Sequence, residues 1–117
     1  MSDIKINIIE QTPGRHIKYA LNSTKIIFGD DELSINLAQR ERDYEVMLDI
    51  CIDVEGGIVI GTGGSARLYA AQIIVSARRY DTIDDGYEID GTKKYKIIPV
   101  PFDMSLCTLI LWGLEEL

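Results

Sequence analysis

The chain has 117 residues, of which 46% are hydrophobic, and a formal net charge of −7. This length is typical of one domain, and the hydrophobic share is too high for a disordered protein, so we expect a single β domain over residues 1–117 with a real core. The negative charge argues against nucleic acid or an anionic membrane as a partner, because phosphate contacts require clustered Lys and Arg.

The N-terminal third of the chain is typical of short strands separated by turns. Isoleucines on every second residue predict a first strand at about 3–10. A type II turn fits Thr12–Arg15, because Pro13 presets φ at its second position and Gly14 takes the positive φ at its third. Three further short strands are expected at residues 17–21, 24–28 and 33–37, and the first and last of them show the period of two.

The stretch Tyr44–Glu55 carries the clearest signal in the sequence. Apolar residues occupy every second position, and mainly acidic residues stand between them. Side chains alternate across a strand, so the pattern predicts one long strand with an apolar face and an acidic face. The acidic face consists of Glu45, Asp49, Asp53 and Glu55. It is either the solvated side of a half-buried sheet or a docking surface for a basic partner.

Residues 66–79 allow two interpretations. Their alanines, Leu, Gln and Arg favour a helix, which Ser65 could cap. The β-branched run at 73–75 favours a strand over 68–76, and the rest of the chain reads as β. We favour the strand, with a short helix within 66–79 as the alternative.

The last third of the chain contains an acidic segment and an apolar strand. Residues 80–92 are expected to form an acidic loop or a loosely ordered hairpin, and residues 93–100 alternate weakly. Ser105–Trp112 is apolar on both faces, which predicts a strand buried on both sides or sealed by a partner. Together these elements predict a mainly β protein, a single-domain antiparallel β-sandwich or open barrel of about eight strands.

Patterns that could carry chemistry are incomplete. Residues 61–66 (GTGGSA) match the dinucleotide fingerprint formally, but no second parallel strand ends at Asp81, so we favour a glycine-rich turn. His16 is the only histidine, which argues against a zinc site and against a histidine-activated cysteine. The acids of the last third do not have the spacing of a helical calcium loop. These acids are Asp81, Asp84, Asp85, Glu88 and Asp90.

We therefore expect no catalytic, cofactor-binding or metal-binding residues and no enzyme activity. The basic patches at 78–79 and 93–96 are flanked by acids and are expected to form ion pairs. Cys51 and Cys107 are expected to be reduced, buried thiols. The N-terminus lacks the basic and apolar regions of a signal peptide, so we expect a cytoplasmic location.

Three segments resemble small uncharacterised proteins encoded in prophages and mobile elements of Gram-positive bacteria. They are residues 8–19 (IIEQTPGRHIKY), the central alternating strand, and residues 99–116 (PVPFDMSLCTLILWGLEE). The resemblance implies a virion, tail or accessory role and supplies no catalytic residues.

We expect a non-enzymatic structural or interaction protein that binds a protein partner or itself as a homo-oligomer. One alternative is an acidic inhibitor that binds a basic or nucleic-acid-binding host protein by charge mimicry. A second alternative is a calcium-dependent binding module.

Overall fold

The computed structural model describes residues 4–63 and 66–114. In this part of the chain there are ten strands, a one-turn helix and a 3-10 turn. The strands are β1 (Asn7–Glu10), β2 (Tyr19–Asn22), β3 (Lys25–Phe28), β4 (Leu33–Asn36), β5 (Val46–Asp53), β6 (Ile58–Ile60), β7 (Ala66–Val75), β8 (Tyr80–Tyr87), β9 (Lys93–Pro99) and β10 (Thr108–Leu111). The helical segments are α1 (Leu37–Arg40) and η1 (Met104–Leu106). The mainly β prediction is confirmed, with ten strands in place of about eight.

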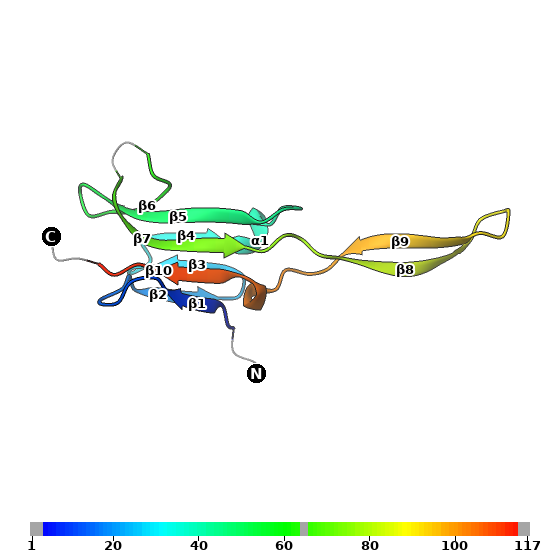
Figure 1. The fold of residues 1–117 in the computed structure, drawn as a ribbon, viewed down its shortest axis with the longest axis horizontal. Coiled ribbons are helices and arrows are strands. Elements are labelled where there is room, and N and C mark those ends of the chain that lie inside the picture. The colour runs from blue at the N-terminus through cyan, green and yellow to red at the C-terminus, as the bar shows by residue number, and fades with distance from the viewer. Residues whose placement is uncertain (1–3, 64–65, 115–117) are drawn as a thin grey trace.

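Two of the three sheets pack face to face as a sandwich (Figure 1). The five-stranded sheet has the order β1-β10-β7-β5-β6, and the three-stranded sheet has the order β2-β3-β4. All strand neighbours are antiparallel except β1 and β10, which are parallel. Of the two architectures expected from the sequence, the chain adopts the sandwich and not the open barrel.

The core lies between the two sheets and is formed by alternate residues of their strands. The register places Leu48, Ile73 and Leu109 in one row across β5, β7 and β10. Ile26 and Phe28 of the small sheet belong to the same buried cluster and are fully buried. Burying an aliphatic or aromatic side chain of this size contributes about 1.5–3 kcal/mol. The side chains buried between the two sheets are therefore a main source of stability.

Strand β5 corresponds to the middle of the predicted Tyr44–Glu55 strand. Its inward residues are Leu48 and Ile50, which are buried, and the register shifts by one residue between Ile50 and Cys51. The end residues of the expected apolar face, Tyr44 and Val54, lie outside β5 and are exposed. The strand is therefore shorter than the alternating pattern.

Residues 66–75 form strand β7, so the strand interpretation is confirmed and the alternative of a short helix within 66–79 is wrong. β7 pairs on one side with β5 and on the other with β10, and these two ladders outweigh the helix propensity of its alanines. The helix lies earlier, at α1. Asn36 is the N-cap of this helix, and its side chain accepts a hydrogen bond from the N–H of Ala38 at 3.1 Å.

Strands β8 and β9 form a hairpin that projects from the end of the sandwich (Figure 1). The segment 80–92, expected to be a loop or a loosely ordered hairpin, is thus strand β8, with a register shift between Asp84 and Tyr87, followed by a tight turn. In the turn Gly91 adopts a φ of 92° and donates to the Glu88 carbonyl at 3.0 Å, and the Asp90 carboxylate accepts from the N–H of Thr92 at 2.9 Å. This is the chemistry of a three-residue hairpin loop with glycine in the left-handed position.

The hairpin dominates the shape of the molecule, which measures 70 × 37 × 23 Å. The radius of gyration is 18.9 Å, whereas a compact chain of this length has about 13 Å. None of the helices in the described ranges is long and apolar enough to cross a membrane.

Candidate functional site

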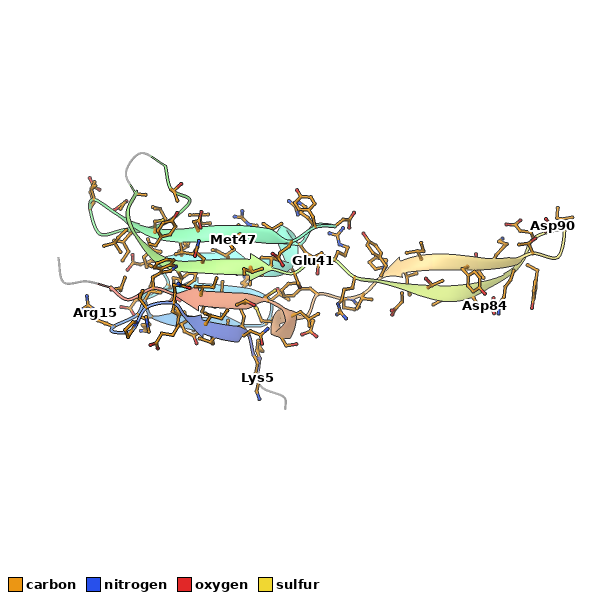
Figure 2. All side chains as sticks on the ribbon, in the orientation of Figure 1. Lys5, Arg15, Glu41, Met47, Asp84 and Asp90 are labelled. Atoms are coloured by element: carbon orange, nitrogen blue, oxygen red, sulfur yellow. The ribbon has the colours of Figure 1, made fainter. Side chains whose placement is uncertain are left out.

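The pairing register sorts the side chains of the hairpin onto two faces. Residues paired across an antiparallel ladder point to the same side of the sheet, and alternate residues along a strand do too. One side, which we call the aromatic face, consists of Tyr80, Thr82, Asp84 and Tyr87 of β8 and Lys93, Tyr95, Ile97 and Pro99 of β9. Figure 2 shows the side chains of the hairpin extending into open space on both sides of the ribbon.

The aromatic face is apolar and uncovered. Tyr87 is 68% exposed, Tyr95 60% and Ile97 68%. Tyr95 and Ile97 are neighbours on one side of β9, and Tyr87 is diagonal to Tyr95 in the register. Isolated exposed apolar residues are normal on a protein surface, but a row of them on a projecting element is typical of an interaction site.

The contacts within the hairpin do not explain its stability. Lys93 lies 3.2 Å from the Asp84 carboxylate and 5.6 Å from the centre of the Tyr95 ring. Ion pairs as exposed as this one contribute about 0–1 kcal/mol. A two-stranded hairpin with no core beneath it is marginally stable in water. The hairpin therefore exposes apolar side chains on its aromatic face. In the described part of the chain, the outer edges of β8 and β9 pair with no further strand.

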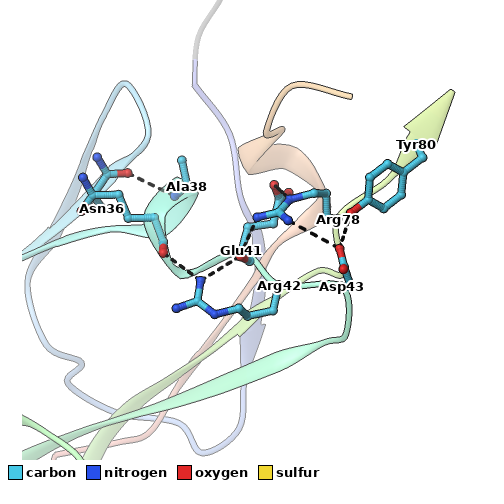
Figure 3. Close-up of polar contacts among 8 residues, drawn as sticks. Asn36, Ala38, Glu41, Arg42, Asp43, Arg78 and Tyr80 are labelled. Carbon is cyan, nitrogen blue, oxygen red and sulfur yellow. Dashed lines mark hydrogen bonds and ion pairs between the residues drawn. The ribbon is translucent and has the colours of Figure 1, made fainter. Parts of the chain in front are cut away.

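The base of the hairpin, in contrast, is held firmly by the connector between α1 and β5 (Figure 3). The backbone N–H of Arg78 donates to the Arg42 carbonyl at 2.7 Å, and its guanidinium donates to the Glu41 carbonyl at 3.1 Å. The same guanidinium lies 3.5 Å from the Asp43 carboxylate, which also accepts a hydrogen bond from the Tyr80 hydroxyl. This cluster fixes the direction in which the hairpin leaves the sandwich.

The groups around Arg78 favour the charged form of its side chain. The pKa of Arg78 is raised above its ordinary value, chiefly by hydrogen bonding to Tyr80, with the negative charge of Asp43 as a further cause. The expected ion pairing of the two basic patches is confirmed for Arg78 and for Lys93. Arg78 is thus a positioning residue for the hairpin.

The four acids predicted as a recognition face have different roles in the structure. Asp53 accepts hydrogen bonds from the N–H groups of Glu55 at 2.9 Å and Gly57 at 2.8 Å, and so closes the turn after β5. Asp49 accepts from the Gln72 side chain at 2.9 Å. Glu45 and Glu55 are exposed and lie just beyond the two ends of β5. Of the four acids, Glu45 and Glu55 are the exposed ones, whereas Asp49 and Asp53 are half-buried.

The outer face of the five-stranded sheet is more apolar than acidic. Gln72 links Asp49 to Trp112, whose indole N–H donates to the Gln72 carbonyl at 3.0 Å, and the Trp112 ring stacks on Tyr69 at 5.7 Å. The register places several apolar residues on this same face, namely Ile9, Met47, Ile74 and Ile110. This face is a second surface that the described part of the chain leaves uncovered.

The remaining chemical candidates are engaged in structure. Cys51 and Cys107 are free and buried, and burial raises the pKa of both thiols, with Asp49 as a further cause for Cys51. The glycine-rich segment at 61–63 leads into strand β7 and not into the helix that a dinucleotide site requires. The ring of His16 lies 2.9 Å from the Thr12 carbonyl.

An open hollow of about 430 Å³ lies beside the 3-10 turn η1. Its acidic lining residue, Asp103, accepts hydrogen bonds from the backbone N–H and the hydroxyl of Ser105. The Asp103 carboxylate caps η1. No second carboxylate lies in the lining, so the lining does not supply a pair of carboxylates for acid–base catalysis. Within the described ranges there is no group of three or more His, Cys, Asp or Glu side chains arranged to hold a metal ion.

Comparisons with protein-family models, with curated proteins and with solved structures return no match.

The projecting hairpin is the feature that sequence reasoning placed least well. Two signals point to it: the Asp90-Gly91 turn, and the alternation of Tyr95 and Ile97 with lysines. The acid run of β8 and its Gly86, which sits at a register shift between Asp84 and Tyr87, obscure the matching pattern on the other strand.

Proposed function

We propose that the protein is a non-enzymatic structural component that self-associates, and that the β8–β9 hairpin is its contact element. The observation that carries this proposal is a hairpin that projects from the sandwich with an exposed aromatic face and, in the described part of the chain, two unpaired outer edges. A second copy would supply the contacts that an isolated hairpin lacks.

The resemblance of the sequence to prophage-encoded proteins supports a virion, tail or accessory role. Such a protein acts in the host cytoplasm or as part of a phage particle. Its proposed working form is an assembly, because the hairpin and the outer face of the large sheet are exposed surfaces that suit repeated contact.

Strand β10 supports self-association through a different surface. Leu109 and Leu111 face the core, while Ile110 lies on the outer face and is half-buried. This arrangement fits the expectation of a strand sealed by a partner. The outer face of the large sheet is therefore a candidate for a second contact, beside the aromatic face of the hairpin.

Light scattering on the purified protein over micromolar concentrations tests the proposal. The expected result is a mass that rises with concentration. Exchanging three residues of the aromatic face for serine (Tyr87→Ser, Tyr95→Ser and Ile97→Ser) is expected to lower the measured mass to that of the monomer. Ile9→Ser with Met47→Ser alters the outer face of the large sheet, and its mass over the same concentrations shows whether this second candidate surface contributes. A strictly monomeric wild-type protein would contradict the proposal.

The charge-mimic alternative draws on the net charge of −7 and on the exposed Glu45 and Glu55. Salt-sensitive capture of a basic protein, lost on Glu45→Gln with Glu55→Gln, is its signature. The hairpin carries more of the argument, because Asp49 and Asp53 already accept hydrogen bonds within the chain.

A further inference from the structure

Charge is divided between the two strands of the hairpin. Strand β8 carries three acids, Asp81, Asp84 and Asp85, and no base. Strand β9 carries three lysines, Lys93, Lys94 and Lys96, and no acid. Each strand pairs only with the other in the described part of the chain, so the hairpin has one acidic outer edge and one basic outer edge.

This division decides how two hairpins can meet edge to edge. Pairing β8 with β8, or β9 with β9, places like charges opposite one another, which destabilises a ladder. Lysines on an edge strand are also a common means of preventing indiscriminate pairing. Pairing β8 of one copy with β9 of another places acids opposite lysines. The charges therefore favour one of the three arrangements.

We propose, resting on the self-association proposed above, that copies of this chain associate head to tail, with β8 of one hairpin beside β9 of the next. Strands β8 and β9 are antiparallel within a hairpin. When two hairpins lie side by side and point in the same direction, β8 of the first is also antiparallel to β9 of the second. The result is a continuous antiparallel sheet that runs through successive copies.

The side chains support this arrangement when neighbouring hairpins lie at equal height. In the register within one hairpin, Lys93 is the diagonal neighbour of Asp84 and contacts it at 3.2 Å, and Lys96 is the diagonal neighbour of Asp81. The same pairs recur across the boundary between copies. The aromatic faces of successive hairpins then join into one row that contains Tyr87, Tyr95 and Ile97 of each copy.

A head-to-tail contact always leaves one free edge of each sign at the ends. It therefore closes into a ring or grows as a filament, and it does not stop at a two-fold dimer. The cluster around Arg78 supports either outcome, because it gives every copy the same hairpin direction.

Complementary charge reversal tests the inference. One variant makes β8 basic, with Asp81→Lys, Asp84→Lys and Asp85→Lys. The other makes β9 acidic, with Lys93→Glu, Lys94→Glu and Lys96→Glu. Both edges of each variant then have the same sign, so each alone is expected to sediment as a monomer. An equimolar mixture restores opposite edges and is expected to regain the wild-type sedimentation coefficient.

A control variant with Lys5→Glu, Lys18→Glu and Lys25→Glu lowers the net charge as much as the acidic β9 variant but changes residues outside the hairpin. It is expected to associate like wild type. The hairpin contributes no residue to the core, so circular dichroism should show all variants folded. Wild-type association that persists in the acidic β9 variant, or a mixture that stays monomeric, would overturn the head-to-tail pairing alone. A monomeric wild type would overturn self-association itself.

Discussion

At the scale of single residues, the structure shows that an acid in an alternating pattern can be used locally. Asp53 fits the outward side of the predicted strand, and its position in the pattern is the same as that of Asp49. Its carboxylate instead closes the turn into β6 through two backbone N–H groups. Periodicity reports the face of a strand, but it carries no information about the hydrogen bonds that end it.

The first prediction concerns this turn. Asp53→Ala should lower the free energy of unfolding by about 1 kcal/mol, because two backbone donors lose their acceptor. Glu55→Ala should change it by less than about 0.5 kcal/mol, because Glu55 is exposed. Urea denaturation of both variants measures the difference. Equal values for the two would mean that the turn does not depend on Asp53.

The second prediction concerns Asp103. Hydrogen bonds from the Ser105 side chain and backbone lower the pKa of Asp103 below its ordinary value of 3.8. A lowered folded-state pKa contributes stability that is complete above 3.8 and is lost as the pH falls through the lower folded value. The melting temperature of Asp103→Ala should thus lie below that of wild type at neutral pH, and the gap should shrink below 3.8. A gap that does not depend on pH would contradict this role.

At the scale of elements, the period-two pattern predicted the strands well where one face is buried. The inward residues of β5 follow the alternation, and so do those of β3. The pattern was weaker for β7, where Ala70 and Ala71 are both buried at an irregularity in the ladder. Local propensity there is nearly balanced between helix and strand, and pairing with two neighbouring strands decides the outcome.

The third prediction compares a core strand with the hairpin. Ile73→Val removes one methyl group from a fully buried site and should cost about 0.5–1.5 kcal/mol. Ile97→Val removes the same group from an exposed site on β9 and should change the stability by less than about 0.5 kcal/mol. Both values come from denaturation of the protein at a concentration where it is monomeric. A similar loss in both would show that the hairpin packs against the sandwich.

The fourth prediction concerns the base of the hairpin. Arg78→Ala removes the contacts with Glu41 and Asp43 and should accelerate hydrogen exchange at Val100, whose N–H donates to the Arg79 carbonyl at 2.9 Å. The loss of global stability should stay near 1 kcal/mol, because the guanidinium is partly exposed. Arg79→Ala is the matched control. Unchanged exchange in Arg78→Ala would mean that the backbone alone holds the hairpin.

At the scale of the whole molecule, the sequence predicted a mainly β chain, with a sandwich and an open barrel as its two possible architectures, but not the projection. Alternation identifies faces that need a core, and these faces form the sandwich. The aromatic face of the hairpin covers no core, and every residue of β8 is exposed. Its place beyond the end of the sheet follows from the connection between β7 and β10, which are neighbours in that sheet. Strand order is a long-range property that a single sequence does not display.

The whole-molecule charge acquires a more specific meaning from the same geometry. The acids of residues 29–55 are spread over turns, a connector and strand β5 with its two flanks. On the hairpin, in contrast, acids and lysines are sorted onto opposite edges. The sequence presented these as an acidic segment followed by a basic patch, and only the pairing of β8 with β9 shows that they form two edges of one element.

The central claim is that the projecting hairpin mediates self-association. The most direct test replaces Tyr80–Pro99 by an Asn-Gly turn and measures the mass of the shortened protein by light scattering beside that of wild type. The core contains no residue of this segment, so the sandwich should remain folded. The radius of gyration of the shortened protein should be about 13 Å. We predict that the shortened protein stays monomeric at concentrations where the wild type assembles. A shortened protein that assembles to the same extent as wild type would contradict the account.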